Sequence, residues 1–252
     1  MMKLIVSGCN GKMGSVVTKL ALANSDIEIV AGFDINEETQ YGYEVFRNPD
    51  DFQGKADVII DFSHPAMLES LLSYAVRTKT PIVVATTGLS DEQKQWLKEA
   101  AEKTAIFFSA NMSLGVNLMI DLVQKAAKIL EDDFDIEIIE KHHNQKIDAP
   151  SGTALAIADA INDCLEEKKE YVYDRHAVRK KRGKTELGIH TVRGGTIVGE
   201  HDVIFAGTDE IIEIKHSAMS KEVFAVGAIT AAKYLKGKQP GFYTMKDLVK
   251  ES

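Results

Sequence analysis

K-L-I-V-S-G-C-N-G-K-M-G, residues 3–14, is the stretch that decides the fold. Residues 3–7 form a short β-prone run, residues 8–14 predict a glycine turn, and residues 15–23 carry apolar side chains at helical spacing. Glycines let the backbone approach a bound pyrophosphate closely, and the first turn of the following helix offers free N–H groups to it. The stretch therefore predicts the opening strand, turn and helix of a dinucleotide-binding unit.

The turn has the spacing G-x-x-G-x-x-G, with Asn10 where a glycine is often found. Because asparagine tolerates positive φ better than most residues, we expect the turn to persist. A glycine turn alone is weak evidence, since a tight turn without a ligand has the same composition. Its context strengthens it, because residues 27–33 form a second β-prone run that ends in Asp34, where an acidic side chain can bind an adenosine ribose. Asp34 is followed by Ile35 and not by arginine, which favours NADH, whereas Lys12 keeps NADPH open.

Strands and helices alternate through the first half of the chain. The pattern predicts strands at 58–62, 81–86 and 105–108 and helices at 65–77 and 91–103. This alternation is typical of an α/β fold with a doubly wound parallel sheet. Ligands bind such sheets beyond the carboxyl ends of the strands, so we expect three polar loops to line the cofactor: Asp61-Phe62-Ser63, Ala85-Thr86-Thr87-Gly88 and Ser109-Ala110-Asn111-Met112.

The second half has a different pattern. A helix is predicted at 116–130, a strand at 135–140 and a helix from Ser151; three further strands at 187–193, 196–206 and 210–216 read as an antiparallel meander. A last helix at 221–236 could return to the first domain. We therefore predict two domains, a dinucleotide-binding domain of residues 1–113 plus 221–252 and a substrate-binding and oligomerisation domain of residues 114–220, built on an open mixed sheet.

Residues 140–154, E-K-H-H-N-Q-K-I-D-A-P-S-G-T-A, group two histidines, a lysine and an S-G-T turn. Three interpretations compete: a metal site, an acid/base centre on an anion-binding turn, or a polar loop that starts a helix. Adjacent histidines on a strand point to opposite faces, and no cysteine or H-x-x-x-H spacing adds a ligand, so we expect no metal.

An acid/base centre suits these residues better than the other two interpretations. The helix start can bind a carboxylate through the N–H groups of Gly152, Thr153 and Ala154. Lys146 adds a positive charge, and a histidine can donate a proton near neutral pH. The grouping suits a small dicarboxylate that receives hydride from a nicotinamide and a proton from the protein, although a capped helix with exposed histidines stays open. We expect Asp148 to have a structural role in the turn.

Composition excludes several other classes. The 252 residues include 44% hydrophobic side chains and carry a formal net charge of −8, which disfavours nucleic acid as a partner. The basic cluster at 175–184 reads as a solvated loop. No stretch approaches the ~20 apolar residues that span a bilayer, so we expect no membrane association. Only Cys9 and Cys164 are present, which fits two free thiols in a cytoplasmic protein.

The motif E-x-x-E-K-H-H-N-Q-K-I-D-A-P-S-G-T-A at residues 137–154 resembles the signature of the bacterial and plant dihydrodipicolinate reductases. The resemblance covers nearly the whole chain, including G-C-N-G-K-M-G, A-T-T-G, S-A-N-M-S, I-V-G-E-H-D and G-F-Y-T-M-K-D-L. It implies reduction of 4-hydroxy-tetrahydrodipicolinate to tetrahydrodipicolinate by NADH or NADPH, in the diaminopimelate route to lysine. It also implies a Rossmann domain and an α+β domain whose sheet builds a homotetramer.

The resemblance further implies a role for each matching residue. His142 is the acid/base residue that protonates the carbon next to C4 after hydride reaches C4, Lys146 is a second proton donor, and His143, Gly152 and Thr153 hold substrate. The implied cofactor contacts are Gly8, Cys9, Asn10, Gly11, Lys12, Met13, Asp34, Ala85, Thr86, Thr87, Ser109, Ala110, Asn111 and Met112. The sequence departs from the commoner family pattern at Ala85 and at Asn144-Gln145, and neither change removes a charged site group.

Two alternative functions remain. The first is another small nicotinamide-dependent dehydrogenase of an amino-acid-derived anion, such as aspartate dehydrogenase. The second is a regulator that senses NAD(P)H without turnover. A sensor has no use for a lysine and a histidine beside an anion-binding turn, so the sequence disfavours it.

Overall fold

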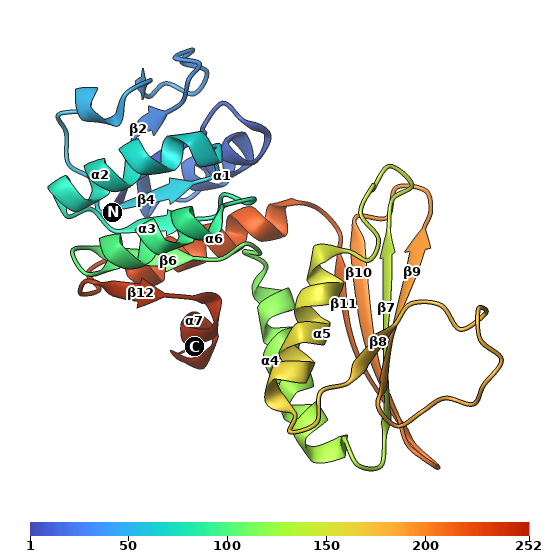
Figure 1. Ribbon diagram of the computed structural model, residues 1–252. Coiled ribbons are helices and arrows are strands. Elements are labelled where there is room, and N and C mark those ends of the chain that lie inside the picture. Colours follow the sequence, from blue (N-terminus) through green and yellow to red (C-terminus); the bar gives the residue numbers. More distant parts are fainter. Residues whose placement is uncertain (252) are drawn as a thin grey trace. The chain divides into compact units, whose positions relative to one another are not determined.

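The computed structural model describes residues 1–251, which divide into two compact units (Figure 1). The first unit contains Met1–Leu114 and the chain from Glu222 onward, and the second contains Gly115–Lys221. Within residues 1–251, no helix is long and apolar enough to cross a membrane.

A seven-stranded parallel sheet forms the centre of the first unit, with the strand order β12-β6-β5-β4-β1-β2-β3. Its strands are β1 (Met2–Ser7), β2 (Ile27–Phe33), β3 (Val45–Phe46), β4 (Val58–Asp61), β5 (Ile82–Val84), β6 (Ala105–Phe108) and β12 (Gly241–Tyr243). The strand order reverses direction between β1 and β4, which is where ligands bind in doubly wound sheets. The predicted fold class is thereby confirmed for this unit.

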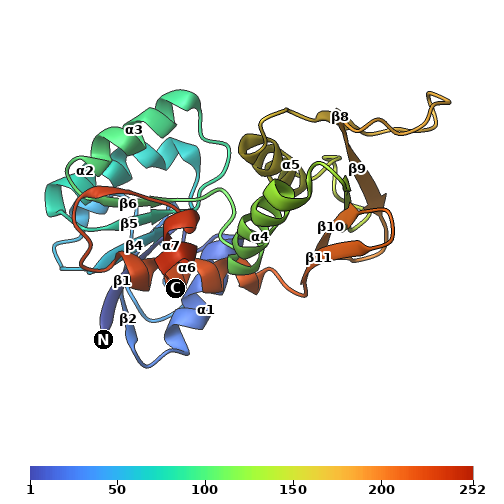
Figure 2. The ribbon, with the colours of Figure 1, turned by 90° about the horizontal axis from the view of Figure 1, so that it is seen from below.

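Helices cover both faces of this sheet (Figure 2). They are α1 (Lys12–Leu22), α2 (Leu68–Thr78), α3 (Asp91–Ala101), α6 (Glu222–Leu235) and α7 (Met245–Glu251), with short 3-10 turns η1 (Pro49–Asp51) and η2 (Pro65–Met67). Side chains of α1, α6 and α7 pack in one core cluster, and those of α2 and α3 pack in another on the opposite face. Strands buried on both faces explain the continuous apolar runs in the sequence, such as Val58-Ile59-Ile60.

The helix after the glycine turn begins at Lys12, three residues before the predicted start. Gly14 therefore lies inside α1 and not in the turn. A Cβ at Gly14 would lie 2.0 Å from the carbonyl oxygen of Gly8, so the absence of a side chain lets the helix pack directly against the turn. The positive-φ explanation for Asn10 is wrong, because Lys79 is the only non-glycine residue in 1–251 with positive φ; in the turn, Gly8 adopts it at +73°.

The second unit contains a five-stranded mixed sheet in the order β11-β10-β7-β9-β8, covered on one face by two helices. The strands are β7 (Asp135–His142), β8 (Glu170–Val172), β9 (Glu186–Arg193), β10 (Gly199–Ala206) and β11 (Ile211–Ala218), and the helices are α4 (Leu114–Leu130) and α5 (Gly152–Cys164). β7 runs two residues further than predicted, so His142 is the last residue of a strand.

The predicted antiparallel meander is wrong in one connection. β10 and β11 are antiparallel neighbours, but β9 pairs in parallel with β7, which lies between β9 and β10. In this central position, Ile136 and Ile138 on the inner face of β7 are fully buried. The connection from β9 to β10 therefore crosses the end of β7, where the Gly194 N–H donates to the His142 carbonyl at 2.9 Å.

The inner face of this sheet changes from apolar to polar along β7. Ile138 lies beside Ile189 on β9 and Val203 on β10, in the core formed with α4 and α5. Two residues further, Glu140 lies between Thr191 on β9 and His201 on β10. We call Thr191, Glu140 and His201 the polar rung, and it lies beside the start of α5, because the Ser151 N–H donates to Glu140.

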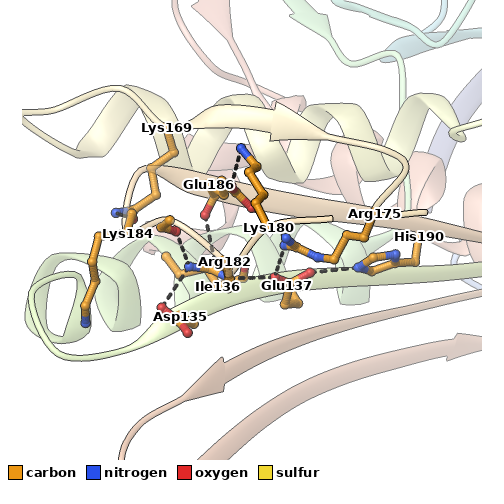
Figure 3. A network of polar contacts seen from close by, with 11 residues as sticks. Asp135, Ile136, Glu137, Lys169, Arg175, Lys180, Arg182, Lys184, Glu186 and His190 are labelled. Atoms are coloured by element: carbon orange, nitrogen blue, oxygen red, sulfur yellow. Dashed lines mark hydrogen bonds and ion pairs between the residues drawn. The ribbon is translucent and has the colours of Figure 1, made fainter. Parts of the chain in front are cut away.

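The outer face carries an ion-pair network that holds the basic cluster (Figure 3). Arg182 donates to Glu137 at 2.8 Å, to Asp135 at 2.7 Å and to three backbone carbonyls. Burial would raise the pKa of Glu137, but hydrogen bonds from Arg182 and His190 outweigh it and lower that pKa. The prediction of a solvated loop is therefore wrong for Arg182, whose charge is neutralised within the unit.

Candidate active site

The glycine turn offers backbone N–H groups at the start of α1. Gly8 approaches the backbone after β4 so closely that a Cβ would lie 2.7 Å from the Phe62 carbonyl oxygen. Gly11 stands at the N-cap and makes no side-chain hydrogen bond to the first turn of α1. These features fit a phosphate group, which the exposed amides and the positive end of the helix dipole attract.

Asp34 joins the turn to the loop after β2. Its carboxylate accepts the Asn10 N–H at 2.9 Å and the Asn36 N–H at 3.1 Å. The Asn10 side-chain amide donates to the carbonyl oxygen of Asn36 at 2.6 Å. Asn10 therefore braces the turn through hydrogen bonds, which explains an asparagine where glycine is common.

Two cavities lie on either side of this turn and share Phe62 and Ser63 in their walls. The smaller, about 330 Å³, is lined by Ser7, Gly8, Asn10, Gly11, Phe33, Asp34, Ile35, Asn36, Phe62, Ser63, His64 and Met67. The larger, about 510 Å³, is lined by Lys12, Met13, Phe62, Ser63, Ala85, Thr86, Thr87, Ala110, Met112 and Phe224. The first unit thus brings together eleven of the fourteen predicted cofactor residues around two adjoining cavities.

The other three predicted cofactor residues line neither cavity. Cys9 is fully buried in the core, where desolvation raises the pKa of its thiol to about 11, so any cofactor contact there is limited to its backbone. Ser109 shapes its own loop, donating from its hydroxyl to the Asn111 carbonyl at 2.7 Å. The Asn111 side chain in turn accepts the Ser113 N–H at 2.9 Å, so both residues hold the loop that presents Ala110 and Met112.

Thr86 is held in place by the buried carboxylate of Asp61. Its hydroxyl donates to Asp61 at 2.7 Å, and the other carboxylate oxygen of Asp61 accepts the Ser63 N–H at 3.0 Å. Asp61 therefore fixes two of the three loops that were predicted to line the cofactor.

In the second unit, Glu140 is fully buried and accepts hydrogen bonds on both carboxylate oxygens. The donors are two N–H groups of Arg193 at 2.8 and 2.7 Å, the Ser151 N–H at 3.0 Å and the Thr191 hydroxyl at 3.1 Å, and His142 Nδ1 lies 2.6 Å from Oε2. Burial alone would raise the pKa of Glu140, but the hydrogen bonds from Arg193, His142 and Ser151 outweigh it and lower that pKa to about 2. Glu140 therefore stays ionised at neutral pH.

His142 is held by one ring nitrogen and is 8% exposed. Its Nε2 faces Gly199, where a Cβ would lie only 3.1 Å away. The His201 ring meets the His142 ring edge-on at 5.3 Å between centroids, and its Nε2 is 2.9 Å from the Ser151 hydroxyl. Burial, followed by the charge of His142, lowers the pKa of His201 to about 4, so His201 is neutral near pH 7.

The start of α5 is capped as predicted, with one difference. The Ser151 hydroxyl accepts the Ala154 N–H at 3.1 Å, so that amide is not available to an anion, contrary to the prediction. Gly152 faces open space, since a Cβ there would meet nothing within 4 Å. Thr153 follows it in the first turn of α5.

Lys146 and His143 lie in the loop between β7 and α5, which closes on itself through the Lys146 N–H and the His143 carbonyl at 3.2 Å. Lys146 Nζ is 2.9 Å from the Asp148 carboxylate. A hydrogen bond from Lys146, with a smaller contribution from the Gly152 N–H, lowers the pKa of Asp148. Within residues 1–251, no group of three or more His, Cys, Asp or Glu side chains is arranged to hold a metal ion.

Sequence reasoning missed Glu140, Arg193 and His201. Glu140 had a signal, because a glutamate follows Ile136 and Ile138 at the two-residue spacing of a strand's buried face. Arg193 and His201 had none, because they lie 53 and 61 positions beyond Glu140 and reach it only through sheet pairing.

Both units match models of the same protein family. The model of the dihydrodipicolinate reductase N-terminus matches residues 2–112, and that of its C-terminus matches residues 115–249. A 4-hydroxy-tetrahydrodipicolinate reductase of Caldanaerobacter subterraneus subsp. tengcongensis is 57% identical, covering 100% of this chain and 99% of that protein. One from Clostridium tetani is 51% identical, covering 97% and 96%.

A solved structure extends the comparison to the fold. The dipicolinate-bound dihydrodipicolinate reductase of Paenisporosarcina sp. TG-14 aligns with a TM-score of 0.83 at 25% identity, covering 97% of each chain. Two family models together span almost all residues, and relatives above 50% identity match over the full length. Both findings indicate the same family. The chain belongs to the dihydrodipicolinate reductase family.

Proposed function

We propose that the protein catalyses the NAD(P)H-dependent reduction of 4-hydroxy-tetrahydrodipicolinate to tetrahydrodipicolinate, in the diaminopimelate route of lysine biosynthesis. Membership of the family supports this, as do relatives named for that reaction over the full chain. The observation that carries it is the pairing of His142 with Glu140 beside the start of α5. A regulator that only senses NAD(P)H has no need of such a proton donor, and another dehydrogenase is disfavoured by the relatives' names.

The first unit binds the nicotinamide cofactor in this proposal. Asp34 and the smaller cavity hold the adenosine, the amides of the glycine turn hold the pyrophosphate, and the larger cavity holds the nicotinamide ring. The fit rests on the open glycine turn and on the two adjoining cavities. When bound, the cofactor supplies the hydride that reaches C4 of the substrate ring.

The second unit binds the dicarboxylate and supplies the proton. The Gly152 and Thr153 amides hold one carboxylate, and Lys146 and His143 hold substrate from the loop before α5. Loss of water from the substrate leaves an unsaturated ring, and His142 gives a proton to the carbon next to C4. Lys146 is the second proton donor, once the incoming carboxylate has taken the place of Asp148 at its ammonium group.

A coupled assay tests the proposed reaction. Pyruvate and aspartate semialdehyde are condensed by the preceding enzyme of the route, and oxidation of NADH or NADPH is followed after this protein is added. We expect oxidation that depends on all components. Absence of oxidation with both cofactors, in a sample that binds NADH, would show that the protein is not this reductase.

The smaller cavity favours NADH over NADPH. Among residues 1–251 that line it, none is lysine or arginine, and the Asp34 carboxylate would repel a 2′-phosphate. We predict a higher kcat/KM for NADH than for NADPH, and a fall in that ratio of roughly tenfold or more in Asp34→Asn, since like charges at close range cost a few kcal/mol. Steady-state kinetics with both cofactors measure it.

Glu38→Gln is the matched control for Asp34→Asn. It removes one negative charge from the same loop, whereas its backbone carbonyl still accepts the Asn10 amide. An NADPH preference in the unmodified protein, or equal effects of the two substitutions, would contradict the role of Asp34.

Assembly and location complete the proposal. A homotetramer built through the five-stranded sheet is supported by apolar side chains among the charges of its outer face, such as Val192, which is 43% exposed. We propose a cytoplasmic location, which the biosynthetic role of the named relatives supports.

A further inference from the structure

The polar rung contains a charge that the core cannot easily accept. Glu140 is fully buried one rung beyond Ile138, and an isolated carboxylate in such a place costs several kcal/mol. A fold that needed only stability would be served by another apolar residue here. The contacts of Glu140 therefore indicate what the charge does.

The two carboxylate oxygens of Glu140 have different partners. Oε2 accepts from His142 Nδ1, and Oε1 accepts from the Ser151 N–H at the start of α5 and from the Thr191 hydroxyl. One rigid group thus connects the proposed proton donor to the proposed carboxylate-binding turn. A shift of either would strain the other.

Arg193 keeps this carboxylate charged. It donates one N–H to each oxygen, in the paired geometry that a guanidinium forms with a carboxylate. The Arg193 nitrogen that donates to Oε1 also donates to the Asp148 carbonyl at 2.7 Å. This second hydrogen bond holds the loop that carries Lys146. An ionised carboxylate can only accept a hydrogen bond, so His142 must donate from Nδ1.

We infer that Glu140 is a positioning residue, which fixes the Nδ1–H tautomer of His142 and so leaves Nε2 to deliver the proton, while Arg193 holds Glu140 ionised. The inference rests on the proposed function, because it specifies which atom delivers the proton. Nε2 is the nitrogen that gains and loses the proton, and the missing side chain at Gly199 leaves space beside it.

Glu140→Gln is the decisive substitution, because an amide cannot satisfy the same donors. If the NH₂ group takes the place of Oε1, it meets the Ser151 N–H and Arg193, and neither can become an acceptor. If it takes the place of Oε2, it still meets one Arg193 N–H, but its other neighbour is His142, whose Nδ1 can accept once the proton moves to Nε2. We therefore expect the amide to invert the tautomer of His142.

The expected effect on activity is a fall in kcat of about 10²-fold or more, with KM changing much less. A ring whose Nδ1 accepts a hydrogen bond from the amide cannot become the imidazolium that delivers a proton from Nε2. The alkaline limb of the kcat–pH profile, where the proton donor has lost its proton, should move to lower pH, since a negative partner of the imidazolium is lost. The charged groups that face His142 are Glu140 from β7 and Arg193 from β9, beside the neutral His201 from β10, and only Glu140 changes. Glu140→Asp should recover part of kcat.

Glu137→Gln is the matched control. Glu137 lies on the same strand, is also bonded to arginines and to a histidine, His190 at 2.7 Å, but faces the ion-pair network of Figure 3. A purely structural role predicts similar losses of kcat in both variants. Nitrogen NMR of histidine-labelled protein reports the His142 tautomer directly.

The outcomes separate the two proposals. Nδ1–H in the unmodified protein, Nε2–H in Glu140→Gln and a kcat loss confined to Glu140→Gln support the inference. The inference is overturned if the His142 proton is on Nε2 in the unmodified protein, or if kcat falls equally in Glu137→Gln. The first of these results is measured on the unmodified protein, so it does not depend on the folding of a variant. Failure of the coupled assay removes the proposed reaction, whereas the tautomer measurement still decides the role of Glu140.

Discussion

Replacing His142 with Gln should lower kcat by about 10²–10⁴-fold, the usual contribution of a positioned proton donor, and change KM far less. The substitution keeps a polar side chain of similar size, so the packing against His201 is largely retained. Gln can still bond to Glu140, but it has no group that gains and releases a proton near neutral pH. The loss therefore falls on the chemical step.

Steady-state kinetics in the coupled assay measure this prediction. His190→Gln is the control, because His190 is likewise bonded to a glutamate on β7 but lies in the ion-pair network away from His142. Its kcat should stay close to that of the unmodified protein. If His142→Gln turned over at the unmodified rate, His142 would have no role as the proton donor.

Gly14→Ala should weaken NADH binding about tenfold or more and lower Tm by roughly 5–10 °C, because overpacking typically costs ~1–3 kcal/mol. The new Cβ would lie 2.0 Å from the Gly8 carbonyl oxygen and 2.8 Å from the Cys9 Cα, so the glycine turn must move away from α1. Backbone atoms cannot rotate aside as a side chain can. The displaced turn would no longer present its amides to the pyrophosphate.

Fluorescence titration with NADH and thermal unfolding measure both effects. Lys19→Ala, on the exposed side of the same helix, is the control for changes in the stability of α1 itself. Equal NADH affinity in Gly14→Ala and Lys19→Ala would contradict the proposed cofactor turn.

Local patterns predicted the first unit well. The β-prone run at residues 3–7, the glycines and Asp34 follow one another within a short span, so period and turn chemistry suffice to place them. The start of α1 was misplaced because a glycine inside a helix is normally unfavourable, and only the close approach to Gly8 explains Gly14.

The second unit depends on distant residues and was predicted less completely. Four of its five strands were found, and β8 was missed. The strand order was not predicted, because nothing local records that β7 pairs with β9 on one side and β10 on the other. For the same reason His142 and Lys146 were identified from their motif, whereas the groups that orient His142 were missed. The pairing partners of a central strand are fixed by burial of the whole sheet.

The polar rung also bears on the order in which the chain folds. Glu140 meets Ser151 across 11 positions of sequence, but Thr191 and Arg193 across 51 and 53, so its environment requires closure of a long loop. Contacts of such separation form late on average, after local helices and hairpins. We expect a nascent chain to acquire its glycine turn and α1 early, and its proton donor only when β9 docks beside β7.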